Sequence, residues 1–307
     1  MTDVLERVDS HRPIDTWAAP LGQAAQRPRT RGWRRLVPWA LGVAIVVGIR
    51  FGYDSAGGVV ALFVIAWPFE RIWRRHPVPV RRIGLRTDVT YALVQPVLGA
   101  IGIVVAAVIG VLSLAWLPGL AVRPIVTALP LWAQAGFGFL ATDVLVYWAH
   151  RLGHEMPFLW RFHAVHHSSV HLDWLSGIRS HPFDGVFIAP AFAFLVGAGV
   201  PLEIAGALAI AQALTGLFAH MNVRWRLKPL HKIVLTPEFH HWHHANEPAA
   251  HHTNYSTFLP VWDLLFGTYR MPDDQRPTRY GIDEPMPNGV LGQVVHPLRR
   301  RRREPSV

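Results

Sequence analysis

Residues 89 to 117 form an uncharged, strongly apolar segment, and it restricts the possible folds more than any other feature of the chain. The segment is 29 residues long, whereas a helix needs about 20 apolar residues to cross the hydrocarbon core of a bilayer. It therefore predicts a transmembrane helix that is tilted, or bent near Pro96. Hydrophobic residues make up 51% of the chain and charged residues only 16%, a balance that is unusual for a soluble protein.

Two further apolar segments follow this one. After a predicted turn at Pro118 to Pro124, Ile125 to Ala149 carries a single charge, Asp143, and should form a helical hairpin with the first segment. Gly185 to Ala219 is 35 residues long, which is too much for one crossing. The region Gly197 to Glu203 predicts the break at which this segment returns as a second hairpin.

The N-terminal third is less regular. Leu36 to Phe69 is apolar but is interrupted by Arg50 and Asp54, so that neither half reaches full spanning length. It is compatible with a short hairpin, or with one span followed by an interfacial helix. Residues 1 to 35 are polar and charged and lack the apolar core of a cleavable signal peptide.

The positive charges predict how the chain is oriented in the membrane. The formal net charge is +10, and most of it lies in Arg27 to Arg35, Arg71 to Arg86 and Arg299 to Arg303, whereas Pro118 to Pro124 contains only Arg123. Because basic loops stay in the cytoplasm, Pro118 to Pro124 should lie outside and the region from His150 onward inside. With so much apolar sequence between the arginines, an anionic lipid surface is favoured over nucleic acid as their partner.

These observations predict an all-α fold, namely a polytopic membrane bundle of two or more transmembrane hairpins with a cytoplasmic, histidine-rich helical cap. We expect four parts in the chain. They are a disordered basic tail (1–35), a membrane-associated segment with a basic linker (36–85), a metal-binding membrane domain (86–272) and a C-terminal tail with a disordered basic end (273–307).

Histidine is concentrated in one region of the chain. Fifteen of the eighteen histidines lie between His150 and His252, and cysteine is absent. Without cysteine there are no disulfides, thiolate zinc sites or iron–sulfur clusters, and every metal ligand must be nitrogen or oxygen. The densest histidines form three blocks, His150-x3-His154, His163-x2-His166-His167 and His240-x2-His243-His244.

Helical spacing makes these blocks candidate metal ligands. Residues three and four apart share one helix face, so each block presents two or three imidazoles to one point, and ordinary packing gives no reason for such crowding. His220 ends an apolar segment on the same side of the membrane and is a ninth candidate. Nine imidazoles supply four or five nitrogens to each of two metals and leave positions open for oxygen, water or substrate.

Other polar residues are candidates for supporting roles. Asp143 and Tyr147 precede His150 on the same helix and could orient a ligand ring through a hydrogen bond, and Asn222 could hold a metal-bound water. His241 points about 100° away from its neighbouring block, so we exclude it as a ligand. His181, followed by Pro182, is a reserve candidate. The remaining histidines of this region are expected at the surface or behind the ligands, namely His171, His231, His251 and His252.

The ordered motifs resemble those of the fatty acid hydroxylase / sterol desaturase superfamily. The resemblance rests on Asp143, the string His150 to His167, Thr236-Pro237-x2-His240-x2-His243-His244, Asn254-Tyr255, and Trp262 to Thr268. The three residues inside the first block match the sterol desaturase branch, and residues 1 to 85 match no family motif. The resemblance marks the eight histidines of the blocks as ligands, His220 as a further family histidine, and Arg179-x-His181-Pro182 as a recurring string.

This resemblance implies the chemistry of a membrane oxygenase. We expect two iron ions, O2 as co-substrate, and hydroxylation or desaturation of an unactivated C–H bond in a membrane lipid that enters from the bilayer. Electrons should come from an external cytochrome or ferredoxin-like carrier, because the sequence contains no flavin, haem or cluster motif. A divalent-metal transporter, or another metal-binding membrane protein, is the alternative.

Two other metal chemistries are excluded by the sequence. The string His154-Glu155-Met156-Pro157-Phe158 lacks the second histidine of an HExxH zinc protease, and Pro157 breaks the helix that such a site needs. A carboxylate-bridged di-iron bundle needs two Glu-x-x-His pairs, whereas the chain has only Glu238-x-x-His241.

Overall fold

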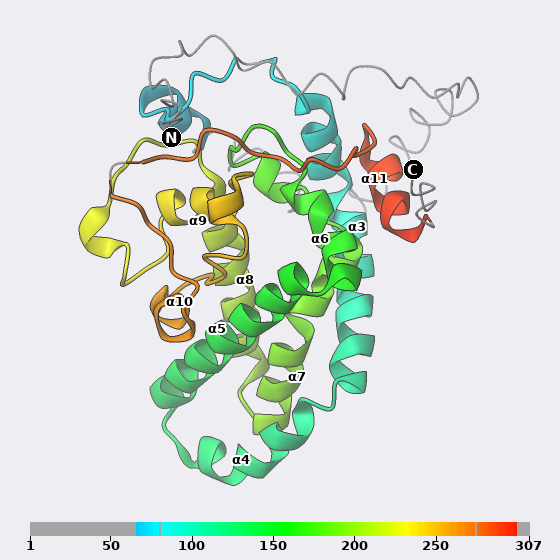
Figure 1. The fold of residues 1–307 in the computed structure, drawn as a ribbon. Coiled ribbons are helices and arrows are strands. Elements are labelled where there is room, and N and C mark those ends of the chain that lie inside the picture. Colours follow the sequence, from blue (N-terminus) through cyan, green and yellow to red (C-terminus); the bar gives the residue numbers. More distant parts are fainter. Residues whose placement is uncertain (1–65, 80, 274, 300–307) are drawn as a thin grey trace, which may run out of the picture.

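The computed structural model describes residues 66–79, 81–273 and 275–299. In these ranges the regular structure is helical, and the β-type pairings are two isolated bridges, Arg74 with Val223 and Ala245 with Tyr280. The predicted all-α class is confirmed for this part of the chain (Figure 1). The predicted tails at residues 1–35 and 300–307, and nearly all of Leu36 to Phe69, lie outside the described residues.

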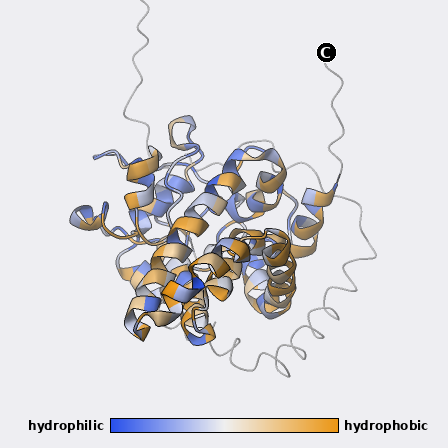
Figure 2. Ribbon diagram, turned by 90° about the horizontal axis from the view of Figure 1, so that it is seen from below, coloured by the Kyte–Doolittle hydropathy of each residue, from blue (hydrophilic) through white to orange (hydrophobic). Residues whose placement is uncertain are grey.

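Helix α3 (Leu85–Leu112) corresponds to the first predicted span, shifted toward the N-terminus. It and α8 (Leu202–His220) are the two described helices that are long and apolar enough to cross a membrane. The core helix of a soluble protein is mostly buried, whereas only 6% of the apolar window of α3 and 11% of that of α8 is buried here. The long helices therefore present hydrophobic surface outward, as Figure 2 shows from the α4 end of the molecule.

The predicted turn at Pro118 to Pro124 is wrong, because these residues lie within helix α4 (Trp116–Ala128). Pro118 occupies the first turn of α4, where its missing N–H would have had no partner in any case. The chain reverses instead at Pro130, which divides the predicted segment Ile125 to Ala149. Helix α5 (Leu131–Glu155) begins after that proline and continues to the histidine-rich end of the molecule.

The break predicted in the third apolar segment is confirmed. Helix α7 (Ala189–Ala198) ends at Gly199, whose φ of 77° suits glycine, and α8 begins after Pro201. Helix α7 has ten residues and, with the preceding 3-10 helix η2 (Pro182–Phe187), forms an apolar stretch of helix that is shorter than a full span. The third apolar segment is therefore divided into a helical stretch that is shorter than a full span and the longer helix α8.

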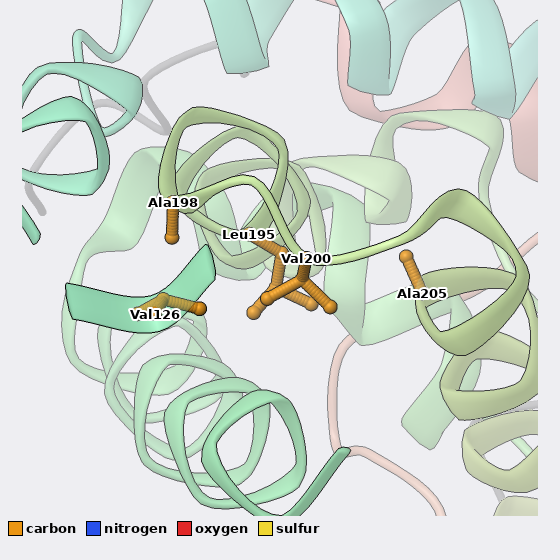
Figure 3. Close-up of a cluster of buried hydrophobic side chains, with 5 residues drawn as sticks. All are labelled: Val126, Leu195, Ala198, Val200 and Ala205. Carbon is orange, nitrogen blue, oxygen red and sulfur yellow. The ribbon is translucent and has the colours of Figure 1, made fainter. Parts of the chain in front are cut away.

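Helices α4, α5, α7 and α8 pack around a small apolar core. Leu195, Ala198 and Val200 are almost fully buried there, and Val126 from α4 and Ala205 from α8 contact them (Figure 3). Helices α4 and α7 approach closely, because a Cβ at Gly119 would collide with the backbone of Phe194, and one at Gly197 with the backbone of Trp116. This packing fixes α4 at one end of the helical bundle (Figure 1).

The short helices gather at the other end of the long ones (Figure 1). Helix α6 (Pro157–His167) follows α5 after a turn at Met156. Helix α9 (Pro237–His243) is capped by Thr236, whose side chain accepts a hydrogen bond from the N–H of Phe239 at 3.3 Å. Both helices have proline in their first turn, where it favours a helix start. Helices α10 (Val261–Phe266) and α11 (Val290–Val295) complete this end.

Candidate metal centre

The structure brings all nine predicted histidine ligands together in two adjoining groups. In each group, one ring nitrogen per residue lies within 4.8 Å of all the others. The first group has five members and the second has four. The first consists of His150, His154, His163, His167 and His243, and the second of His166, His220, His240 and His244.

Two of the three blocks divide between the groups. His163 and His167, which are one turn apart on α6, belong to the first group, and His166 belongs to the second. On α9 the arrangement is reversed, because His240 and the following His244 belong to the second group and His243 to the first. Each of these helices therefore lies between the two groups and contributes to both, so that the groups form one continuous centre.

The second group has the spacing of a coordination sphere. The Nε2 atom of His220 lies 3.0 Å from that of His244, 3.2 Å from that of His166 and 3.3 Å from that of His240. Metal–imidazole bonds of about 2.0–2.1 Å place neighbouring nitrogens about 2.8–3.4 Å apart. The four rings therefore converge at a separation that one metal ion would hold.

Backbone carbonyl groups fix which ring nitrogen carries the proton in four of the histidines. The Nδ1 atoms lie 2.6–3.0 Å from carbonyl oxygens, which only accept hydrogen bonds, so each Nδ1 is protonated and each Nε2 presents a lone pair. The pairs are His150 with Tyr255, His166 with Arg179, His220 with Gly216, and His243 with Thr253.

This proton placement has a direct consequence for the centre. The Nε2 atoms of His166 and His220 are 3.2 Å apart with both lone pairs facing each other, so no hydrogen bond can join them. In the first group, the Nε2 atoms of His154, His167 and His243 are buried and have no hydrogen-bond partner within the described residues. A cation between the rings would remove both the repulsion between facing lone pairs and the cost of burying unpaired ring nitrogens. The residues present therefore fit two metal ions.

The rings are neutral, as metal ligands must be. Burial lowers the pKa of His163 and of His166 to about 3. Burial and the neighbouring imidazoles also keep the pKa of His167, His240, His243 and His244 well below the usual range. Imidazole binds metal in its neutral form, so no proton has to leave these six rings before a metal binds at neutral pH.

Comparison with known proteins places this centre in a family. The family model described as fatty acid hydroxylase matches residues 135–268, a range that includes all nine histidines. The ornithine lipid hydroxylase OlsE of Rhizobium tropici is 33% identical over 261 residues, which cover 82% of this chain and 76% of the relative. The chain belongs to the fatty acid hydroxylase family.

More distant relatives share mainly this part of the chain. An alkylglycerol monooxygenase of Danio rerio is 30% identical over 151 residues, and a very-long-chain aldehyde decarbonylase of Oryza sativa, GL1-5, is 29% identical over 177 residues. Each alignment covers 48% of this chain, but only 32% and 26% of the respective relative. No solved structure matches the chain.

Among the supporting residues, Asp143 does not have its predicted role at a ligand ring. Its carboxylate accepts hydrogen bonds from the N–H groups of Phe258 and Leu259, both at 3.1 Å, and from the indole of Trp262 at 2.8 Å. Asp143 thus anchors the loop that leads into α10. That loop follows Tyr255, whose carbonyl binds His150, so Asp143 acts on the centre only indirectly.

Tyr147 and Asn222 also support the centre indirectly. The Tyr147 hydroxyl is hydrogen-bonded to Thr268 at 2.9 Å, and its ring packs against Tyr255. The Asn222 amide is hydrogen-bonded to both backbone groups of His76, at 2.9 and 3.0 Å. Tyr147 therefore holds the Thr268 side chain, and Asn222 holds the backbone at His76.

The remaining histidines lie outside the two groups. His241 is fully buried but has one ring nitrogen 3.0 Å from the Tyr280 hydroxyl and the other 3.1 Å from the Met221 carbonyl, in agreement with its predicted position. His181 uses both ring nitrogens, because Nδ1 accepts from the N–H of Phe183 and Nε2 donates to the carbonyl of Val294. His251 and His252 are exposed.

Asp184 is the residue that the sequence analysis missed. One of its carboxylate oxygens accepts from the backbone N–H of His181 at 3.0 Å, and the other lies 3.7 Å from Nδ1 of His163. The sequence does carry a signal for it, since His181 and Asp184 have the spacing of a capping box at the start of η2. Asp184 is therefore a carboxylate that makes an ion-pair contact with a histidine of the first group.

Gly177 gives a test of how tightly the centre is packed. A Cβ at this position would lie 2.8 Å from Cγ of His220 and 3.0 Å from its Nδ1. We expect Gly177→Ala to displace the His220 ring from Gly216 and to lower metal occupancy in the second group. Metal analysis of the purified variant checks this. Gly136→Ala is the control, because a Cβ there meets nothing within 4 Å, and unchanged metal content in Gly177→Ala would contradict the packing argument.

Proposed function

We propose that the chain is an integral membrane oxygenase that holds two iron ions and hydroxylates a C–H bond of a membrane lipid with O2. The observation that carries the proposal is the convergence of nine imidazoles in two adjoining groups. The facing lone pairs in the second group and the unpaired ring nitrogens in the first call for two cations. The chain also lies in a family whose named relatives are lipid hydroxylases and monooxygenases. When bound, the two iron ions would supply the activation of O2.

Each group would hold one iron ion. The first group offers five nitrogens and the second group offers four, so both metals keep positions that histidine does not fill. Iron suits this set because nitrogen-rich sites with open positions are typical of non-haem oxygen chemistry. Hydroxylation is proposed over desaturation because the relatives are named for hydroxylation and monooxygenation.

The membrane setting of the proposal rests on the exposed apolar helices and the distribution of charge. Helices α3 and α8 would cross the bilayer, and the histidine-bearing end would face the cytoplasm, because the arginines at positions 71 to 86 precede α3 at that end. Arg123 lies on α4 at the opposite end. In this orientation an external cytochrome or ferredoxin-like carrier would deliver electrons from the cytoplasm.

The lipid would reach the centre through a cavity of about 890 Å³ between α3 and α7. The cavity lining is mainly apolar, and Asp184 and His181 belong to it. Because Asp184 lies beside His163, this part of the cavity adjoins the first histidine group. We infer that the hydrocarbon chain lies in this cavity while the carbon to be oxidised faces the metals.

A divalent-metal transporter fits the geometry less well. Transport sites lie near the middle of the membrane, between broken helices. Here the ligands lie at the ends of α5 and α8 and on the short helices α6 and α9. A centre near the membrane surface suits a reaction that needs both a lipid from the bilayer and an electron carrier from outside it.

The decisive experiment is an oxygen-labelling assay. The full chain, purified with iron in lipid nanodiscs, is given a chemical reductant and ¹⁸O2, and lipids are analysed by mass spectrometry. The proposal expects O2 consumption that depends on lipid, and one ¹⁸O atom in the lipid product. Metal flux across vesicles without O2 consumption would support the transporter instead and would overturn the proposal.

A further inference from the structure

The cavity between α3 and α7 is mainly apolar and follows much of the length of α3. Its lining on α3 extends from Gln95 to Val111, which corresponds to about 24 Å at 1.5 Å per helical residue. Small residues on this face make the space, and they include Gly99, Gly102 and Gly110. Along this length α3 lies against η2 and then against α7 (Figure 1).

The two ends of the cavity differ in chemistry. Contacts along α3 order the lining, because Gly102 lies against Pro182 of η2 and Gly110 against Ala189 of α7. Gln95, Ser180 and Asp184 therefore belong to the end nearer the histidines, and the far end is lined by apolar side chains that include Val111, Trp116 and Val196. A bound lipid would place its polar part at the first end and its hydrocarbon tail at the second.

Two acceptor atoms at the polar end make no hydrogen bond within the described residues. They are the amide oxygen of Gln95 and the Oδ1 atom of Asp184, and both are buried. The contact between that Asp184 oxygen and Nδ1 of His163, at 3.7 Å, is longer than a hydrogen bond, so the oxygen can still accept one from a ligand. Leaving a buried acceptor unsatisfied is costly, so a ligand that supplies a donor at this point would gain affinity.

We propose that Gln95 and Asp184 form a polar subsite that recognises an N–H or O–H donor of the lipid substrate. A carboxylate oxygen accepts hydrogen bonds, so the subsite favours amide-linked or hydroxyl-bearing lipids over plain esters, which have no donor. Because Asp184 adjoins His163, the carbon that is oxidised lies close to this polar group and far from the methyl end of the chain. This inference rests on the proposed function for its description of the ligand as a substrate.

Binding of matched lipids tests the subsite without any turnover. N-methylpalmitamide has one N–H, and N,N-dimethylpalmitamide has none, while their sixteen-carbon acyl chains are identical. We expect the first to bind the full chain in nanodiscs about tenfold more tightly, since one hydrogen bond to a charged group contributes roughly 1.5 kcal/mol or more. Calorimetry measures both affinities, and equal affinities would overturn the proposal.

Two variants locate the effect within the cavity. Gln95→Leu should reduce the preference for N-methylpalmitamide, because it removes one of the two acceptors. Ala107→Phe, a change in the apolar part of the lining, should weaken both lipids alike and leave the preference unchanged. A full preference in folded Gln95→Leu, verified by its melting temperature, would also overturn the proposal.

These measurements remain separate from the test of the proposed function. The affinities of the two amides are measured without reductant, so they do not depend on oxygen chemistry. A chain that incorporates ¹⁸O into lipid but binds both amides equally would refute the subsite alone. A chain that prefers the N–H amide but consumes no O2 would refute the proposed function and leave the subsite standing.

Discussion

Replacing His244 with alanine should halve the iron content of the protein, from two ions per chain to one, and lower lipid oxidation at least about 100-fold. The Nε2 atom of His244 lies 3.0 Å from those of both His220 and His240, so its loss leaves the second group with three ligands. The five histidines of the first group remain. Iron and activity are measured on the same preparation, by mass spectrometry of the metal and by lipid product.

A matched control lies in the same histidine-rich region. His252 is exposed and has a φ of 60°, a conformation that asparagine tolerates well, so His252→Asn should retain both iron ions and full activity. If His244→Ala kept two iron ions, or if His252→Asn lost them, the assignment of ligands to the second group would be wrong.

The second large effect is expected at Arg179. Its guanidinium donates two hydrogen bonds to Oδ1 of the fully buried Asp88, at 2.8 and 2.5 Å, and a third to Ser168 at 2.9 Å. Arg179→Met removes these bonds and leaves the Asp88 carboxylate with Arg82 as its ion-pair partner. Breaking a buried pair costs about 3–5 kcal/mol of stability, and the remaining pair with Arg82 should keep the loss near the lower end of that range.

This substitution should also reach the metal centre. The carbonyl of Arg179 accepts the hydrogen bond that fixes the His166 ring, so movement of this segment should reduce iron binding as well. Chemical denaturation in detergent measures the loss of stability. Arg151→Met is the control, because its pair with Glu155 is partly exposed and should contribute less than about 1 kcal/mol. Equal losses in the two variants would contradict the importance of the buried pair.

The sequence predicts well which histidines converge, because the spacing of histidines on a helix is a local property. His163 and His167 are one helical turn apart whatever the rest of the chain does, and the same holds for His240 and His244. The division of the nine histidines into a group of five and a group of four does not follow from local spacing. It depends on how α6 and α9 lie relative to each other, which is decided by packing between distant segments.

Supporting residues are harder to predict, because most of the contacts that fix the rings come from the backbone. The carbonyl groups of Tyr255, Arg179, Gly216 and Thr253 carry no sequence signal, since every residue has one. Asp143 stands out in the sequence as an acid in an apolar segment, yet it binds a loop. Asp184 is inconspicuous there, and it lies beside His163.

The errors in the fold have a similar origin. Pro118 and Pro124 indicate a turn when taken alone, but tight packing of α4 against α7 keeps this segment helical. Glycine is required at Gly119 and Gly197 for that contact, and only the partner helix reveals why. The hydropathy of one segment does not predict helix boundaries that depend on such contacts.

The most direct test of the account is the metal content of the unmodified chain. The full-length protein, expressed with iron and purified in nanodiscs, is analysed for metal by mass spectrometry and for iron state by ⁵⁷Fe Mössbauer spectroscopy. The account predicts two iron ions per chain in nitrogen-rich sites, both removed by a chelator together with lipid oxidation. A single metal ion per chain, or full oxidation activity after the iron has been removed, would contradict it.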